Sequence, residues 1–255
     1  KDMLECMTVA GERNWQMPAA KPIDMPHAEL PIEPYLFGYW IGDGASQNSS
    51  ITIGIDDQDE ALPLIGHGYE VRGKDELRCM PERVAETRGA SGRLEGNSSI
   101  HSALKALGVL NNKHIPMKYL RASQAQRNDL LAGLIDSDGW VNQSKGLVEI
   151  TTIKIGLANE ILELARTLGH RARLYSERAT LNGRDVGAKY RISWVARAGG
   201  GKLKRKAIPD RSSLGQPNRL ITRYVDAIEA VDSVPVRCIA VANDDHLYLA
   251  GKDFL

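Results

Sequence analysis

Two nearly continuous apolar stretches, each ending in Asp-Gly, are the clearest pattern of hydrophobic and polar positions along the chain. Residues 34–44 read Pro-Tyr-Leu-Phe-Gly-Tyr-Trp-Ile-Gly-Asp-Gly, and residues 129–139 read Asp-Leu-Leu-Ala-Gly-Leu-Ile-Asp-Ser-Asp-Gly. Pro34 suits the first turn of a helix, where a missing N–H costs nothing. Ser123 and Gln126 form a capping-box pattern ahead of the second stretch. We therefore predict two helices, each ended by a glycine in the left-handed conformation.

Each predicted helix is followed by segments with the composition of strands. An amphipathic helix is predicted over residues 155–168, before Gly169, and a counterpart over residues 99–107, before Gly108. The predicted strands are residues 50–55, 69–72 and 76–80 in the first part, and residues 147–152, 171–176 and 190–195 in the second. The two parts of the chain therefore repeat one order of elements.

A short Lys-x-Ile-Pro sequence closes each copy, at residues 113–116 and 206–209. This weak internal repeat predicts an α+β fold of two pseudo-symmetric halves. The expected divisions are a lead-in segment at residues 1–31, a first half at 32–121, a second half at 122–230 and a C-terminal segment at 231–255. Within the last segment, residues 236–241 and 246–251 are predicted to be strands. Cys6 in the lead-in and Cys238 in the last segment are predicted to be buried strand residues.

Small residues four positions apart lie on one face of each predicted helix and let two helix backbones approach closely. They are Gly38 and Gly42 in the first helix and Gly133 and Ser137 in the second. Such packing would bring Asp43 and Asp138 together at the helix ends. Two carboxylates at the negative ends of two helices repel each other unless a cation lies between them. The pattern therefore predicts an oxygen-ligand site for Mg²⁺, able to hold the water and leaving oxygen of a phosphodiester in line.

Composition narrows the class of protein. The hydrophobic fraction of 42% and the charged fraction of 25% are those of a globular protein, and no run of about 18 apolar residues predicts a membrane span. Three widely spaced cysteines argue against a zinc cluster or a disulfide framework. The net charge of +1 hides an asymmetry, because residues 145–223 contain seventeen basic and only six acidic residues. That excess suits the neutralisation of phosphates, with a solvated charged surface as the alternative.

The second apolar stretch carries a family motif. Residues 131–139 match LAGLIDADG at eight of nine places and differ only at Ser137. Residues 36–44 keep the glycine at the third place and the final Asp-Gly, with Ile41 in place of the first aspartate. Over roughly residues 32–224 the chain resembles the LAGLIDADG homing endonucleases. The resemblance implies two antiparallel β-saddles packed through a two-helix interface, with the saddles along the DNA major groove.

The resemblance also implies the chemistry. It indicates a monomeric, site-specific endonuclease that cuts both strands of a long DNA target and leaves 3′ overhangs. Mg²⁺ is the expected cofactor, with Mn²⁺ or Ca²⁺ as substitutes. The expected metal site comprises Asp43, Asp138 and the residues directly before them, Gly42 and Ser137.

Lysines and arginines complete the expected site. Lys113 is the implied active-site lysine and Lys206 its weaker counterpart, with Lys202 and Lys204 competing for the second role. Because strand residues alternate between two faces, alternate basic positions are expected to face DNA. The expected DNA contacts are Arg171, Arg173, Lys189, Arg191, Lys202 and Lys204.

The flanking segments resemble those of an intein. Residues 15–22 and the C-terminal segment look like the lead-in and closing strands of a splicing domain, so we expect an endonuclease originally embedded in an intein within a host protein. Lys1 and Leu255 stand where splicing requires other residues, and we expect no splicing. The expected setting is the cytoplasm of a prokaryotic or phage-type system. Two other interpretations stay open, a catalytically decayed DNA-binding module and an RNA maturase.

Overall fold

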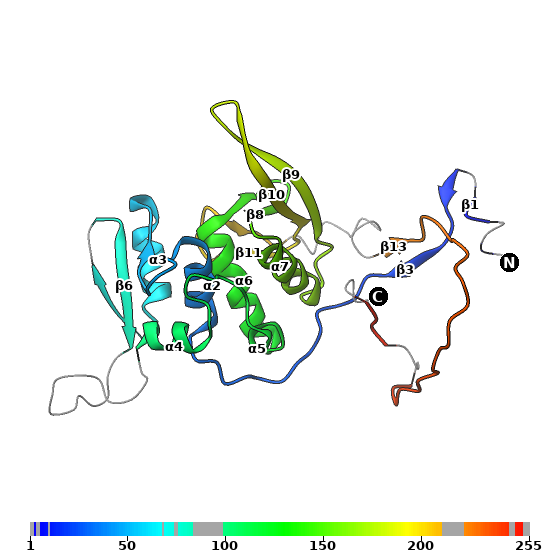
Figure 1. Ribbon diagram of the computed structural model, residues 1–255, viewed down its shortest axis with the longest axis horizontal. Coiled ribbons are helices and arrows are strands. Elements are labelled where there is room, and N and C mark those ends of the chain that lie inside the picture. Colours follow the sequence, from blue (N-terminus) through cyan, green and yellow to red (C-terminus); the bar gives the residue numbers. More distant parts are fainter. Residues whose placement is uncertain are drawn as a thin grey trace.

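Two central helices organise the protein. The computed structural model describes Met3 and residues 6–9, 11–67, 69–73, 76–83, 99–210, 222–244 and 248–251. Helices α2 (Pro34–Asp43) and α6 (Gln124–Asp138) lie side by side, with one antiparallel sheet on each side of the pair (Figure 1). The predicted α+β fold, with two similar halves joined by a two-helix interface, is confirmed.

Glycines set the distance between these helices. A Cβ atom on Gly38 would overlap the backbone of Leu130, and one on Gly133 would overlap the backbone of Tyr35. A Cβ atom on Gly42 would overlap the side chain of Ser137. The predicted small-residue interface is therefore correct, and it places the two backbones in direct contact.

The helix ends differ from the prediction in one respect. Gly44 and Gly139 have φ values of −76° and −78°, which is not the left-handed conformation. A Cβ atom on Gly44 would overlap Trp40, and one on Gly139 would lie 2.6 Å from the carbonyl oxygen of Ile135. Any residue can adopt this φ, so backbone conformation does not require glycine here. Glycine is needed after each aspartate because a side chain would not fit. The predicted capping box at the start of α6 is present.

The first half contains a small sheet and several short helices. In chain order its elements after α2 are β4 (Ile51–Thr52), the 3₁₀ turn η1 (Ile55–Asp57), α3 (Gln58–Ile65), β5 (Tyr69–Gly73), β6 (Arg78–Arg83), α4 (Ile100–Ala106) and α5 (Met117–Leu120). The strand order is β4-β6-β5, antiparallel throughout. The predicted strand at residues 50–55 is wrong beyond Thr52, because the chain turns into η1 and α3. Pro63 lies inside α3, which concealed that helix in the sequence.

The second half has a larger sheet, with the antiparallel order β7-β8-β10-β9. Its elements after α6 are β7 (Gly139–Asn142), β8 (Leu147–Thr152), α7 (Ile155–Thr167), β9 (Arg173–Leu181), β10 (Arg184–Val195), β11 (Gly199–Gly200) and β12 (Ala207–Ile208). Predicted strand 147–152 and the helix before Gly169 are confirmed. Strands β9 and β10 are longer than predicted, and their hairpin projects from the body (Figure 1). Asn182 and Gly183, with φ of 50° and 76°, form its two-residue turn.

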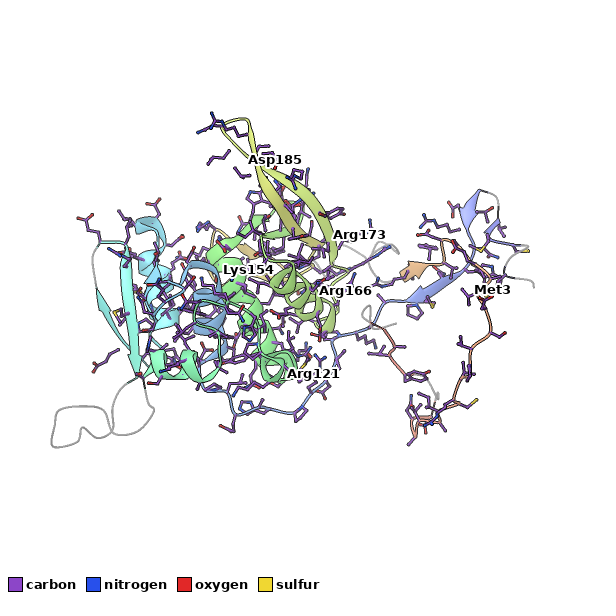
Figure 2. The ribbon with its side chains drawn as sticks, in the orientation of Figure 1. Met3, Arg121, Lys154, Arg166, Arg173 and Asp185 are labelled. Carbon is purple, nitrogen blue, oxygen red and sulfur yellow. The ribbon has the colours of Figure 1, made fainter. Side chains whose placement is uncertain are left out.

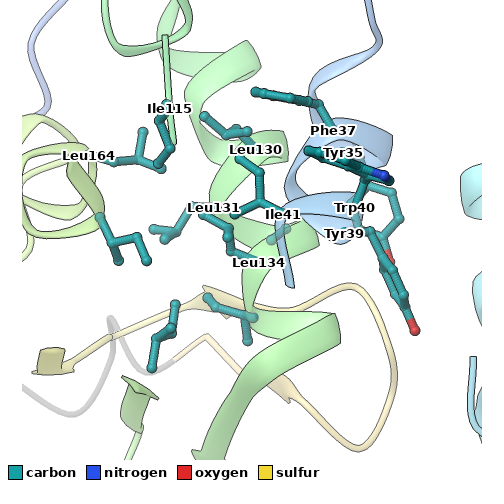
Figure 3. Packing of buried hydrophobic residues seen from close by; sticks show 14 of the residues in the cluster. Tyr35, Phe37, Tyr39, Trp40, Ile41, Ile115, Leu130, Leu131, Leu134 and Leu164 are labelled. Atoms are coloured by element: carbon teal, nitrogen blue, oxygen red, sulfur yellow. The ribbon is translucent and has the colours of Figure 1, made fainter. Parts of the chain in front are cut away.

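One apolar core runs through both halves. It includes Phe37 and Trp40 from α2 and Leu130 and Leu134 from α6 (Figure 3). The fully buried Arg127 ties the lead-in to this body, because its guanidinium donates to the carbonyl oxygens of Ala122, Thr167 and Ile23. Among the described helices, none has the length and apolar character needed to cross a membrane.

The short strands of the lead-in segment form two small ladders. Strand β3 (Gln16–Pro18) pairs with β13 (Thr222–Tyr224), and β1 (Thr8–Val9) pairs with β2 (Glu12–Arg13). The predicted strand at 236–241 is wrong, because these residues do not form a strand. Residues 248–251 of the second predicted strand do not form one either. Residues 246 and 247 lie outside the described part. Cys6 and Cys238 are exposed rather than buried.

Candidate active site

The two motif aspartates end the central helices. Asp43 is the last residue of α2 and Asp138 the last residue of α6. Because the helices touch at Gly42 and Ser137, their C-terminal ends meet at one place. Burial and the neighbouring Asp138 raise the pKa of Asp43 to about 6. Burial also raises the pKa of Asp138, although its side chain stays open to solvent on one side. The contact of the two helix ends thus brings the two carboxylates near each other.

Lys113 lies at the end of α2. Its ammonium donates a hydrogen bond to the carbonyl oxygen of Gly42 at 2.9 Å and lies 5.2 Å from the centre of the Trp40 ring. Burial lowers the pKa of Lys113 to about 8, while Asp138 and Asp43 favour its charged form. Lys113 and Asp138 line the same cleft, together with the end of β8. A lysine ammonium has three donors, and the Gly42 carbonyl occupies one of them.

Lys206 lies at the end of α6. Its ammonium donates to the carbonyl oxygens of Ile135 and Asp136 at 2.8 Å and of Ser137 at 2.9 Å. The residue is 4% exposed, and burial lowers its pKa. Three acceptors match the three donors of an ammonium, so Lys206 caps the last turn of the helix. Each helix end therefore carries one lysine, held in a different way.

The two lysines and two aspartates interact across the interface. Among the positive charges, Lys206 lowers the pKa of Asp43 most, and Lys113 lowers the pKa of Asp138 most. Among the lysines, the one from the other half thus favours the charged form of each carboxylate most. The four charges form one electrostatic unit at the contact of the two helices.

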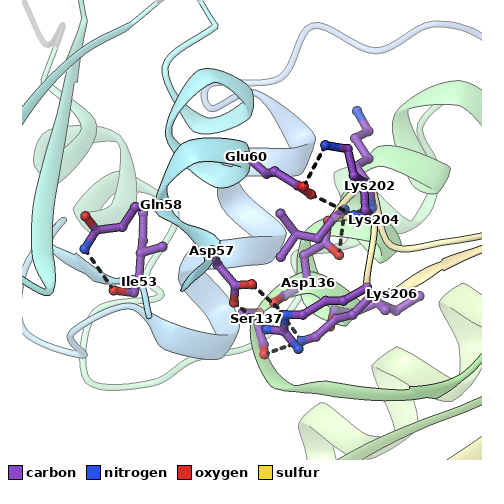
Figure 4. A network of polar contacts seen from close by, with 12 residues as sticks. Ile53, Asp57, Gln58, Glu60, Asp136, Ser137, Lys202, Lys204 and Lys206 are labelled. Carbon is purple, nitrogen blue, oxygen red and sulfur yellow. Dashed lines mark hydrogen bonds and ion pairs between the residues drawn. The ribbon is translucent and has the colours of Figure 1, made fainter. Parts of the chain in front are cut away.

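The structure distinguishes among the lysines that the sequence left open. Lys202 pairs with Asp129 at 2.6 Å and lies 4.8 Å from the centre of the Tyr35 ring. Lys204 pairs with Glu60 at 3.1 Å (Figure 4). Only Lys206 of these three donates to the helix end. Its neighbour Arg205 pairs with Asp57, so the loop of residues 201–206 is bound to the acidic η1–α3 region of the first half.

Asp136 was missed by the sequence analysis. It is 1% exposed, and its carboxylate accepts hydrogen bonds from the Tyr35 hydroxyl at 2.8 Å and from the backbone N–H groups of Lys202 and Leu203. The signal was present, because a charged residue within an apolar helical stretch needs a polar partner when it is buried. The partners lie 66 and 67 residues away and were not predictable from spacing.

Residues 114–205 match the sequence model of the homing endonuclease family. This span begins beside Lys113 and contains α6 with its complete motif. Over these residues the chain belongs to the homing endonuclease family. The resemblance to homing endonucleases that the Asp-Gly motifs indicated is confirmed at the level of the family.

Similarity to known proteins extends beyond residues 114–205. Over 250 residues, or 98% of its length, the chain is 31% identical to the replicative DNA helicase DnaB of Mycobacterium intracellulare. The aligned region is 38% of the helicase, so the chain spans well under half of that relative. Among solved structures, I-DmoI in complex with DNA and Mn is 13% identical with a TM-score of 0.39, covering 64% of this chain and 89% of that one. I-DmoI with DNA and Ca is 14% identical with a TM-score of 0.40, covering 66% and 84%.

Three basic residues of the large sheet, Arg173, Lys189 and Arg191, lie on its outer face. The strand register aligns Arg191 with Thr151 and Tyr175, and Lys189 with Glu177, whereas Ile192 and Trp194 point into the core. Because side chains alternate, the predicted positions 173, 189 and 191 lie on one face, as expected. Figure 2 shows Arg173 at the base of the projecting hairpin.

Acidic side chains form ion pairs with some of these basic residues. Arg191 bridges Glu149 and Glu177, and its guanidinium carbon lies 4.7 Å from the centre of the Tyr175 ring. Lys189 also pairs with Glu177, at 3.3 Å. Arg171 lies two residues before β9. The charge excess seen in the sequence is thus partly neutralised within the chain.

The helix ends provide oxygen donors for a metal. Among the described residues, no group of three or more His, Cys, Asp or Glu side chains is placed to hold a metal ion. The available donors are the carboxylates of Asp43 and Asp138 and the carbonyl oxygens of Gly42 and Ser137. Both carbonyls accept a lysine hydrogen bond, and each has a second lone pair. This hard-oxygen set with open positions fits Mg²⁺ better than zinc.

Proposed function

We propose that this member of the homing endonuclease family is a site-specific endonuclease that hydrolyses both strands of a long double-stranded DNA target and leaves 3′ overhangs. The observation that carries the proposal is the pair of aspartates at the ends of two touching helices, each end also bearing a lysine. Two mutually repelling carboxylates in partly buried positions are unfavourable for stability, so their placement indicates a functional site.

Asp43 and Asp138 would bind Mg²⁺, with Mn²⁺ or Ca²⁺ as substitutes, and Gly42 and Ser137 would offer their carbonyl oxygens. When bound, the cation would offset the repulsion between the carboxylates and polarise the phosphodiester and a water molecule. The raised pKa values of both aspartates match a site that awaits a positive charge.

Lys113 and Lys206 are the proposed lysines of the site. Lys113 has donors beyond the one bound to Gly42, and it lines the cleft that contains Asp138. Its ammonium is therefore suited to stabilise charge that develops on the phosphate. Lys206 would act mainly through the field at Asp43, since its three donors are already used by α6 carbonyls.

The outer face of the large sheet is the proposed DNA surface. Arg171, Arg173, Lys189 and Arg191 would contact DNA there, with the hairpin of β9 and β10 reaching along the groove. Lys202 and Lys204 would contact phosphates beside the helix ends, after exchange of their pairs with Asp129 and Glu60. Both acids are on the surface, where such pairs contribute little stability.

The host context follows from the coverage of the helicase match. Nearly all of this chain, motifs included, aligns with a minor part of the helicase. We therefore place the chain in an intein that interrupts a replicative helicase, in a cytoplasmic setting. Residues 1–31 and 231–255 would then be splicing-domain segments flanking the halves at 32–121 and 122–230. Pairing of β3 with β13 joins the lead-in segment to the end of the second half. Because one chain supplies both aspartates, a monomer suffices.

Cleavage of a supercoiled plasmid tests the proposal. The plasmid would carry the uninterrupted helicase sequence at the insertion point, and we expect Mg²⁺-dependent conversion to a linear form. Asp43→Asn and Asp138→Asn should each slow cleavage at least about a hundredfold, because each removes charge that holds the cation. Salt-dependent binding by the wild-type chain without cleavage would instead identify a decayed DNA-binding module. Full cleavage by either variant would refute the proposed mechanism.

A further inference from the structure

A buried carboxylate joins the loop of residues 201–206 to the central helices. Asp136 accepts from the hydroxyl of Tyr35 at 2.8 Å, from the backbone N–H of Lys202 at 2.7 Å and from that of Leu203 at 3.2 Å. Tyr35 belongs to α2, Asp136 to α6, and the two N–H groups to the loop (Figure 4 shows Asp136 beside Lys202 and Lys206). One side chain thus connects three separate segments.

The loop transmits this anchoring to Lys206. Gly201 donates its N–H to the carbonyl oxygen of Lys206 at 3.0 Å, and Lys206 donates its own N–H to Leu203 at 2.8 Å. A Cβ atom on Gly201 would overlap the Asp136 carboxylate, so the loop approaches as closely as a backbone can. Leu203 is 1% exposed and holds the middle of the loop in the core. The backbone of Lys206 is therefore bound to the residues that Asp136 holds.

The first half lacks this arrangement. Ile41 occupies the matching position in α2 and is 3% exposed in the apolar core. Lys113 approaches from the segment before α5, where its side chain meets Gly42 and Trp40. A carboxylate that holds the lysine-bearing loop is thus a feature of the second half, within the described residues.

We propose that Asp136 is a positioning residue that places Lys206 at the end of α6, and so serves one of the two strand cleavages. The inference rests on the proposed endonuclease function. Asp136→Asn keeps the size of the side chain but replaces one acceptor oxygen with an NH₂ donor. In the acid all three donors reach Oδ2, and the N–H of Leu203 is also within 3.3 Å of Oδ1. The amide lacks the negative charge that strengthens these bonds, and its NH₂ group at the Oδ1 position would meet the N–H of Leu203. The loop loosens, and the Lys206 ammonium loses its fixed position near Asp43.

Strand-specific nicking under single-turnover conditions tests the inference. The substrate is the cognate duplex, labelled separately on each strand, with Mg²⁺ present. We expect Asp136→Asn to slow one strand about tenfold or more and the other less than about twofold. Lys206→Met should slow the same strand, and the double variant should be no slower than Lys206→Met alone. Affinity for the duplex with Ca²⁺ should change less than the nicking rate, because most of the proposed DNA contacts lie on the large sheet, outside this loop.

Two further variants separate positioning from folding. Tyr35→Phe removes one of the three donors and should slow the same strand by a smaller factor, even if Asp136→Asn fails to fold. Glu163→Gln makes a matched acid-to-amide change at the exposed pair with Arg121 and should leave both rates unchanged. Equal slowing of both strands, or additive effects of Asp136→Asn and Lys206→Met, would overturn the inference while leaving wild-type cleavage intact. Failure of the wild-type chain to cleave would instead refute the proposed function.

Discussion

The two halves have the same frame and unequal sites. Each half ends a central helix in an aspartate and places a lysine at that end. Lys113 donates to one carbonyl oxygen, whereas Lys206 donates to three. The second half also has the larger sheet and the buried Asp136. A shared helical interface therefore fixes the acids, while separate segments in each half decide how each lysine is held.

The shared frame can be tested by filling the helix contact. Gly133→Ala places a methyl group where the Tyr35 carbonyl oxygen lies, and Gly38→Ala does the same at Leu130. We expect either change to lower the free energy of unfolding by about 3 kcal/mol and to disturb both sites together. Urea denaturation measures the loss. Gly156→Ala in α7 is the control, because nothing lies within 4 Å of the added atom, and helix propensity predicts a small gain. Equal behaviour of Gly133→Ala and Gly156→Ala would contradict the close contact.

The unequal lysines can be compared directly. Lys206→Met leaves three carbonyl oxygens at the end of α6 without their donor, and we expect a loss of about 2 kcal/mol in the free energy of unfolding. Lys113→Met removes one such bond, and we expect a loss below about 1 kcal/mol. Both variants should reduce nicking. Urea denaturation in EDTA compares their stabilities, and equal losses would show that the two lysines are held alike.

A histidine beneath the larger sheet predicts a pH dependence specific to the second half. His170 stacks on Trp194 with ring centres 5.7 Å apart, and burial lowers its pKa to about 4. In the unfolded chain its pKa is about 6.5, so the unfolded state gains a proton first as the pH falls. The stability contribution is complete above about pH 6.5 and is lost progressively towards pH 4.

We expect wild-type protein to lose about 1–2 kcal/mol more than His170→Leu between pH 7 and pH 4.5. Chemical denaturation at each pH provides the measurement. Parallel stability curves for the two proteins would show that His170 titrates normally in the folded state.

Local patterns predicted much of the frame. The capping box of Ser123 and Gln126, the start of α2 at Pro34 and the end of α7 before Gly169 depend on interactions within a few residues. The length of β9 and β10 was missed because their hairpin is stabilised by its own Asn-Gly turn and pairing rather than by a strong apolar alternation. The strand predicted at residues 236–241 failed for the opposite reason. Its β-branched residues suit a strand, but no neighbouring strand is present in the described part to pair with it.

The sequence by itself determined the two helices, their glycine contacts and the pair of aspartates. In each copy of the motif, small residues four positions apart set the helix contact, and the aspartate follows directly at the helix end. Only the tertiary structure decided which lysine binds the end of the second helix, since Lys202, Lys204 and Lys206 are close in sequence but bind three different partners. It also decided that Asp136 binds a loop more than sixty residues away. Contacts between distant segments depend on how the whole chain packs, and no local spacing contains that information.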